Sequence, residues 1–315
     1  MHRIVRTASS LLRLALVAAV ATPAAAQFVE PEVDVIRRLD GAQDAGFFGW
    51  ITANVGDLDG DGLDDLLVPA IGFDGFSGRV QVFSSADGSV LLDAVGAPGA
   101  ALGYTATRAG DVDGDGVPDV VVGGGQALVL SGADGSVLLD ASGLLPFVDA
   151  VAGLGDIDGD GIGDIAIGFS DAATPGAGRV QAVSGSDASV LWTVDGAGPT
   201  DGLGSALGRL DDLDGDGVDD LVAGAQNAGP ANGGEAFVIS GADGTVLRTL
   251  RPTRPENASS FGLFFASGTP DMTGDGVGEI YVGDLGAETE KGPATGTAHV
   301  FSGRVGRSVR NTVPS

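Results

Sequence analysis

The chain has 315 residues and no cysteine, and its 43 Asp and Glu far outnumber its 16 Lys and Arg, which gives a formal net charge of −27. Without cysteine it has no disulfide scaffold, zinc finger or thiol nucleophile. The negative charge argues against binding to a phosphate backbone, so no nucleic-acid partner is expected. Hydrophobic residues make up 43% of the sequence, which indicates a folded chain rather than an acidic disordered one.

The first 26 residues have the pattern of a secretion signal. Arg3, Arg6 and Arg13 supply positive charge at the start, Leu11–Val20 is a short apolar stretch, and three alanines at 24–26 offer a cleavage site. We therefore predict a signal peptide over residues 1–26 and a secreted, periplasmic or cell-surface location for residues 27–315. The apolar stretch is too short to span a membrane and no later segment is long enough, so no membrane span is expected.

One acidic motif recurs five times along the rest of the chain. Each copy has Asp at positions 1, 3 and 5, Gly at positions 4 and 6 and an acid at position 9, except that the fifth copy has Thr at position 3. The five copies are residues 57–65, 111–119, 156–164, 212–220 and 271–279. They begin roughly 45 to 60 residues apart, and a regular period of this kind indicates a repeat architecture.

The sequence around each motif predicts short strands. A run rich in β-branched residues follows the motif, as at Val120–Val122, and a second such segment comes later, as at Arg79–Phe83. An Asp-Gly turn signal, such as Asp87-Gly88, then precedes a last segment. With the strand before the motif, each unit is expected to be a four-stranded antiparallel meander. The density of Gly and turns, with no long segment of helical period, argues against helices.

Four-stranded units in tandem are typical of propeller blades. We predict an all-β fold, a β-propeller of four-stranded antiparallel blades, with five blades because five units of this spacing fill the chain. The motif-bearing units are expected at about 47–95, 101–142, 146–196, 202–250 and 260–315. Two segments compete to close the ring, Val33–Leu39, which we favour, and Ser308–Val313.

The motifs predict calcium sites between the first and second strands of each unit. Carboxylates on alternate residues repel one another, and a hard divalent cation with oxygen ligands relieves that repulsion. Positions 1, 3, 5 and 9 would supply side chains, and position 7 would supply a backbone carbonyl. The four strong sites are Asp57, Asp59, Asp61, Leu63, Asp65; Asp111, Asp113, Asp115, Val117, Asp119; Asp156, Asp158, Asp160, Ile162, Asp164; and Asp212, Asp214, Asp216, Val218, Asp220.

The fifth loop is expected to bind calcium more weakly or to stay empty, because a hydroxyl replaces a carboxylate at position 3. Its ligands would be Asp271, Thr273, Asp275, Val277 and Glu279. None of the five loops fits an EF-hand, because position 12 is apolar and a strand follows in place of a helix.

The motif resembles the FG-GAP repeat, which builds the calcium-binding β-propeller of integrin α subunits and of many bacterial exported proteins. Phe48-Gly49 before the first copy and Val222-Ala223-Gly224-Ala225 after the fourth carry the resemblance. It covers nearly the whole chain after residue 26 and implies the fold and the calcium loops. Integrin α propellers have seven blades, with leg domains and a membrane span that this chain lacks, so integrin partnership and signalling are not implied.

Three functions remain open from the sequence. The first is a binding or adhesion module with structural calcium, whose extracellular protein or glycan partner binds on the face opposite the calcium loops, where the connections vary most. The second is a glycosidase with two carboxylates. No motif surrounds any candidate, so an enzyme is not expected and no catalytic residue or organic cofactor is assigned. The scattered candidates are Asp74, Asp149, Asp171, Asp201, Glu235 and Glu256.

The third function is a lectin, since sugar sites use aromatic platforms. Trp50 and Tyr104 occupy equivalent positions in the first two units. Packing on the inner strand is the favoured interpretation of both side chains.

Overall fold

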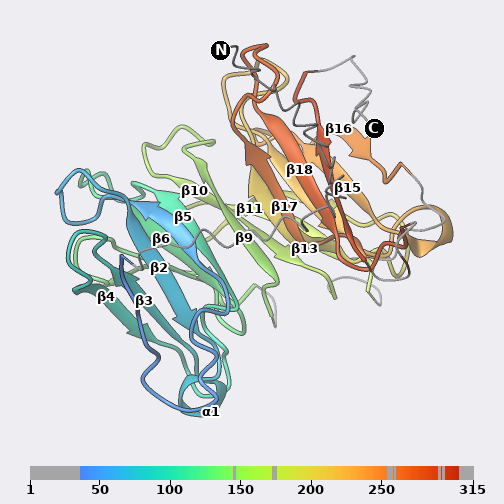
Figure 1. Ribbon diagram of the computed structural model, residues 1–315. Helices are drawn as coiled ribbons and strands as arrows, with labels where there is room; N and C mark the ends of the chain where they lie inside the picture. The colour runs from blue at the N-terminus through green and yellow to red at the C-terminus, as the bar shows by residue number, and fades with distance from the viewer. Residues whose placement is uncertain are drawn as a thin grey trace, which may run out of the picture. The chain divides into compact units, whose positions relative to one another are not determined.

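The computed structural model describes residues 36–144, 147–171, 176–253, 258, 260–289, 292 and 295–304. The chain divides into two units, Met1–Arg38 and Leu39–Ser315, and all five sheets lie in the second. In every sheet the strands pair antiparallel with their neighbours in chain order (Figure 1). Within the described part of the chain, no helix is both long enough and apolar enough to cross a membrane.

The strands fall into five consecutive groups. The first sheet contains β1 (Ala53–Gly56), β2 (Asp65–Ala70), β3 (Arg79–Phe83) and β4 (Val90–Val95). The second contains β5 (Thr105–Gly110), β6 (Asp119–Gly123), β7 (Leu128–Leu130) and β8 (Val137–Asp140). The third contains β9 (Ala150–Gly155), β10 (Asp164–Phe169), β11 (Arg179–Val183) and β12 (Val190–Asp195). The fourth contains β13 (Leu203–Arg209), β14 (Leu221–Ala225), β15 (Glu235–Ile239) and β16 (Val246–Leu250). The fifth contains β17 (Phe261–Thr269), β18 (Glu279–Asp284) and β19 (Thr297–Phe301).

The prediction of an all-β fold built from antiparallel meanders is confirmed, with three strands in the described part of the fifth sheet. The helical segments are short. A four-residue turn of helix, α1 (Phe73–Phe76), lies between β2 and β3, and a 3-10 turn, η1 (Pro230–Asn232), lies between β14 and β15. Both lie in connections between the second and third strands of their sheets.

Several sequence predictions fall on residues that the structure does not describe. The signal peptide over residues 1–26, the start of the segment Val33–Leu39 and the whole of Ser308–Val313 lie outside the described residues. Residues 36–39 are described and are not in a strand. The closing of the ring therefore stays a prediction.

The central strands are buried on both faces, which explains their continuous apolar sequence. All residues of β6 and β10 are buried. The fourth strands contain exposed positions, as in β4, where Val90 and Val95 are exposed and Leu92 is buried. This difference places the second and third strands inside the fold and the fourth at the outer edge.

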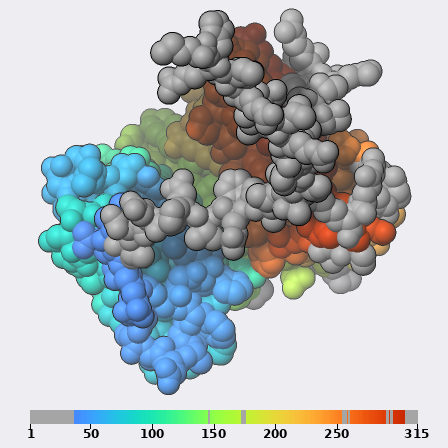
Figure 2. Space-filling view, viewed as in Figure 1, coloured from blue at the N-terminus to red at the C-terminus, as the bar shows by residue number. Residues whose placement is uncertain are grey.

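Hydrophobic contacts join each sheet to the next. Four buried clusters bridge consecutive sheets, and the first of them unites Val55 and Val80 of the first sheet with Val120 and Leu128 of the second. In the space-filling view these two sheets, blue to teal, form one continuous mass (Figure 2). The first strands also pack side by side in the order β1, β5, β9, β13 and β17. The sheets are therefore arranged as blades whose first strands face a shared interior.

The turns between the third and fourth strands follow the Asp-Gly signal. In four sheets the Asp side chain accepts a hydrogen bond of 2.8 Å from the backbone N–H two residues later. The residue between them has a positive φ, and it is Gly88, Gly135 or Gly244 in three sheets. In the third sheet it is Ala188, with φ 62°. A side chain in this left-handed region is strained, so Ala188 is a weak point of an otherwise regular turn.

Candidate functional site

The five acidic motifs form loops that gather carboxylates. In every loop, three carboxylates each offer an oxygen, and these oxygens lie within 4.8 Å of one another. The groups are Asp57, Asp59 and Asp61; Asp111, Asp113 and Asp115; Asp156, Asp158 and Asp164; Asp212, Asp214 and Asp220; and Asp271, Asp275 and Glu279. Each loop joins the first strand of a sheet to the second, as expected from the sequence. Several Asp-rich groups compatible with a metal ion are therefore present.

The position 1 carboxylate organises each loop from its centre. Asp57 accepts hydrogen bonds from the backbone N–H groups of Gly60 at 2.7 Å, Asp61 at 3.1 Å and Gly62 at 2.8 Å. The glycines at positions 4 and 6 have positive φ in all five loops, as with Gly60 at 78° and Gly62 at 89°. Positive φ is needed here because the chain turns its N–H groups inward toward one carboxylate.

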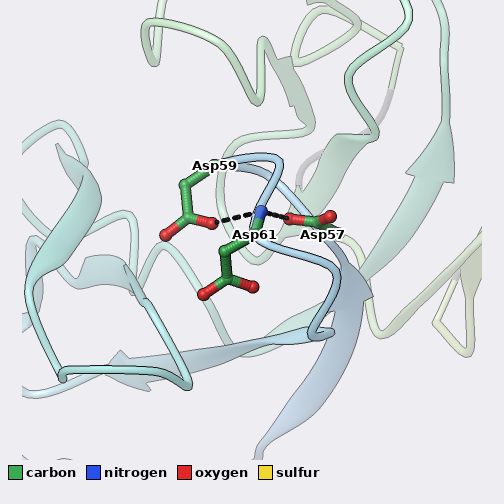
Figure 3. Close-up of side chains that lie close together, drawn as sticks. All are labelled: Asp57, Asp59 and Asp61. Atoms are coloured by element: carbon green, nitrogen blue, oxygen red, sulfur yellow. Dashed lines mark hydrogen bonds between the residues drawn. The ribbon is translucent and has the colours of Figure 1, made fainter.

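The carboxylates at positions 3 and 5 each use one oxygen for the backbone. Asp59 Oδ1 accepts from the N–H of Asp61 at 3.1 Å, and Asp61 Oδ1 accepts from the N–H of Leu63 at 2.8 Å. Figure 3 shows the Asp61 nitrogen between the carboxylates of Asp57 and Asp59. Because the second oxygen of Asp59 and of Asp61 is not needed by these backbone bonds, it can face a cation. The carbonyl ligand expected at position 7 stays a prediction.

The position 9 acid has a second role that the sequence analysis missed. It is buried in all five loops, with at most 2% of its surface exposed. Asp119 accepts from the N–H of Val112, at position 2 of its own loop, at 2.6 Å, and from the N–H of Gly132, beyond the third strand, at 2.9 Å. The same pair of bonds recurs at the other three aspartates of position 9. We call this arrangement the carboxylate staple, because it fastens the acidic loop to the turn between the third and fourth strands.

The two kinds of carboxylate have opposite pKa shifts. Hydrogen bonds from backbone N–H groups, chiefly that of Gly62, lower the pKa of Asp57, and similar bonds lower the pKa of Asp212 and Asp271. Burial raises the pKa of Asp220 to about 6 despite its two backbone hydrogen bonds. Burial also raises the pKa of Asp119 and Asp164. A divalent cation beside these buried groups would favour their charged forms.

The fifth loop departs from the other four in two ways. Glu279 at position 9 uses only Oε2, which accepts from the N–H of Met272 at 2.6 Å, and its Oε1 is buried without a hydrogen-bond partner among the described residues. Arg304 donates to the backbone oxygen of Asp275 at 2.7 Å and lies 3.7 Å from its carboxylate. An unpartnered buried oxygen fits a cation, whereas the nearby guanidinium would compete with one.

A second feature lies between the first strands. They line a cavity of about 790 Å3, together with the residues just before β1, β5 and β9. Trp50, Phe264 and Phe265 contribute side chains that are 45%, 48% and 49% exposed. Tyr104 also lines the cavity, and its ring centroid lies 5.9 Å from that of Trp50 and 5.0 Å from that of Phe147. Trp50 therefore packs on Tyr104, to whose carbonyl its Nε1 donates at 3.1 Å, as the interpretation favoured from the sequence has it, while the rest of its side chain is exposed to the cavity.

The scattered carboxylates proposed as glycosidase candidates do not come together. Only Asp149 lines the cavity, and its Oδ2 accepts from the N–H and the hydroxyl of Ser170, both at 2.7 Å. Asp201 accepts from the N–H of Gly198, and Glu235 pairs with Arg251 at 2.6 Å. Asp74 lies in α1 and Asp171 lies just after β10, and neither lines the cavity; Glu256 is outside the described residues.

Comparisons with known proteins bear on the repeats. Residues 57–122 match the FG-GAP-like repeat family. Human integrin alpha-IIb is 40% identical over 93 residues, which cover 27% of this chain and 9% of the integrin chain. A solved structure, "Crystal structure of WD40 beta propeller domain of Doa1", is similar over 76% of this chain and 60% of that chain, with a TM-score of 0.47 and 14% sequence identity.

Proposed function

Because the chain is an FG-GAP repeat protein with a stretch that resembles integrin alpha-IIb, we propose that it is an exported binding or adhesion module in which calcium is structural. Calcium would be held in the loops by the carboxylates of positions 1, 3, 5 and 9. When bound, the ion would neutralise clustered charge and clamp the first strand of each sheet to the second. The partner would be an extracellular protein or glycan.

One observation carries the calcium part of this proposal. Five loops of equivalent sequence each bring three carboxylate oxygens within 4.8 Å of one another, in a chain with a net charge of −27. Such clusters repel in the absence of a cation, and carboxylate and carbonyl oxygens are the ligands that calcium prefers. Four loops would bind strongly. The fifth would bind more weakly, because it has Thr273 at position 3 and Arg304 beside Asp275.

Backbone strain supports placing the partner on the face opposite the calcium loops. Seven of the nine non-glycine residues with positive φ in the described chain lie in connections on that face. They are Ala45, Phe47, Asp74, Phe76, Ala101, Ala231 and Asn232. Two of them, Phe47 and Phe76, are each 52% exposed and have ring centroids 6.2 Å apart. Strained loops and exposed aromatic side chains on a rigid scaffold are frequent at recognition surfaces.

The experiment replaces the loops of this face. Residues 71–77 can be exchanged for the tight connection over residues 124–126, which joins the same two strands in the second sheet. A matched control exchanges the turn of residues 186–188, on the calcium-loop face, for that of residues 133–135. Binding of labelled protein to intact cells and to immobilised extracellular matrix should fall for the first variant only, with thermal stability in calcium retained. Equal binding by both variants would refute this placement of the partner.

Binding is favoured over hydrolysis by the composition of the cavity. Glycosidases use a pair of carboxylates about 5–10 Å apart. Among the described residues, the cavity lining offers one carboxylate, that of Asp149.

A further inference from the structure

The cavity has an ordered lining that becomes clear when residues are counted back from the first Asp of each loop. The residues seven positions before it are Trp50, Tyr104, Asp149, Ser205 and Phe264, and all five line the cavity. We call them the aromatic tier, since three of the five are aromatic. This tier lies where the first strands begin, at the end away from the calcium loops.

A second tier lies four residues further along the strands. At three positions before the first Asp, Arg108 of β5 and Arg209 of β13 line the cavity. Four residues of extended strand span about 13 Å, and in a strand residues separated by an even number face the same side. Tyr104, directly before β5, and Arg108 within it therefore face the same side of the extended chain, and both line the cavity. Thr52, Thr105 and Ser267 are among the other residues that line it.

The two arginines differ in their partners. Arg209 pairs with Asp219, at position 8 of its own loop, with 2.6 Å between Nη2 and Oδ2. Asn54 holds the same place in the first sheet and donates to Asp64, also at position 8, at 2.8 Å. In the second sheet position 8 is Pro118, whose side chain has no hydrogen-bond acceptor. Arg108 therefore makes no ion pair within the described residues and is exposed.

We propose that this cavity binds an acidic oligosaccharide, whose sugar rings stack on the aromatic tier and whose carboxylate pairs with Arg108. The inference rests on the proposed binding function and names one class of partner for it. A guanidinium without an ion pair among the described residues is a specific site for a carboxylate, because it offers a planar fork of donors. Aromatic rings take the apolar face of a sugar, and hydroxyl side chains hydrogen-bond its rim.

Other ligands fit this lining less well. A volume of about 790 Å3 lies within the range of small-molecule sites. A purely apolar ligand would leave Arg108 and the threonine hydroxyls without partners, which costs binding energy. A cation would meet the aromatic rings and Asp149 favourably, but it would also face two guanidinium groups. The negative charge of the whole chain opposes an anion at long range, and salt together with calcium in the loops screens that field.

The test measures binding by calorimetry in millimolar calcium and physiological salt. The probes are hexasaccharides of hyaluronan, heparosan and polysialic acid, each beside its methyl-esterified, uncharged form. We expect at least one acidic probe to bind and its ester to bind about tenfold more weakly or not at all. Arg108→Gln should weaken binding by about tenfold or more. The matched variant Arg209→Gln, at the equivalent position but already paired with Asp219, should have a smaller effect.

A second pair of variants tests the aromatic tier. Trp50→Ala should weaken binding strongly, and Trp50→Phe should retain most of it, because a ring remains for stacking. Thermal stability in calcium should be similar for all four variants, since Trp50, Arg108 and Arg209 are exposed. Any one of three results would overturn the inference. They are no binding of any acidic probe, equal affinity for an acidic probe and its methyl ester, or an equal loss of affinity in Arg108→Gln and Arg209→Gln. The exchange of residues 71–77 tests the proposed function separately, because those residues do not line the cavity.

Discussion

Asp61→Asn should separate the effect of calcium from that of the loop's own hydrogen bonds. Asp61 uses Oδ1 to accept from the N–H of Leu63, and an asparagine at this position keeps that acceptor. The substitution removes one charge from a cluster whose oxygens lie within 4.8 Å of one another. In chelator the variant should be at least as stable as the unchanged protein, because repulsion falls. In calcium it should be less stable, because the first loop loses a ligand.

The size of the calcium effect follows from mass action. Extracellular calcium modules bind with Kd of about 10⁻⁴–10⁻³ M, and free ion at about ten times Kd stabilises the folded state by about 1.4 kcal/mol per site. For a domain of this size, 1 kcal/mol corresponds to about 2–4 °C in Tm. Loss of one loop should therefore lower Tm in calcium by about 3–6 °C. If all five loops bind, chelation should remove about 7 kcal/mol in total.

The assay is thermal unfolding, followed by circular dichroism in EDTA and in millimolar calcium. Asp134→Asn is the matched control, since Asp134 is exposed, accepts from the N–H of Ser136 at 2.8 Å and belongs to none of the clusters. It makes the same change of charge without touching a calcium loop. Equal shifts for the two variants in calcium, or the same shift for Asp61→Asn in EDTA as in calcium, would refute the reasoning.

Three further outcomes are expected. Ala188 and Gly135 have positive φ in equivalent turns. In urea titrations, Ala188→Gly should therefore raise the free energy of unfolding by about 0.5–1 kcal/mol, and Gly135→Ala should lower it by a similar amount or more. In EDTA, the free energy of unfolding should fall by up to about 3 kcal/mol as pH rises from 4 to 7. The folded pKa of Asp220, about 6, lies above its unfolded value, so that ionisation of this carboxyl group opposes folding. Glu279→Gln should stabilise the protein by about 1–2 kcal/mol in EDTA, since the new amide can donate to Asp271 or Asp275, whereas the buried Oε1 of Glu279 has no partner among the described residues. It should also lower the number of calcium ions bound in calorimetry.

The sequence was sufficient to predict the sheets and the loops because both depend on local patterns that recur five times. The β-branched runs after each motif became β2, β6, β10, β14 and β18. The Asp-Gly pairs marked the turns, since those turns need positive φ and Gly supplies it. The alternating carboxylates came together because the glycines at positions 4 and 6 fold each loop around its first Asp.

The features that the sequence analysis missed depend on residues far apart in the chain. The position 9 acid was interpreted only as a ligand, yet its second hydrogen bond goes to an N–H group at the end of the third strand, such as that of Gly132 for Asp119. The equivalent positions of Trp50 and Tyr104 could be recognised in the sequence, because each residue directly follows a Phe-Gly or Leu-Gly pair. The third aromatic residue of the tier, Phe264, does not follow its pair directly. It lies in β17, whose pairing register shifts between Phe261 and Ala266. Counting back from the first Asp, rather than forward from the Phe-Gly pair, would have found it.

The carboxylate staple has a consequence for how such a chain unfolds under force and how it can gain sheets in evolution. It joins two connections of one sheet, the acidic loop and the turn between the third and fourth strands. Neighbouring sheets meet chiefly through apolar side chains, with polar bonds such as that from Trp192 Nε1 to the carbonyl of Gly241. Pulling on a terminus should accordingly peel away whole sheets in succession, each leaving in a single force step. Duplication of one unit of the gene can likewise add a complete sheet that carries its own staple. A fragment of one sheet would instead leave the position 9 acid without its hydrogen-bond donors.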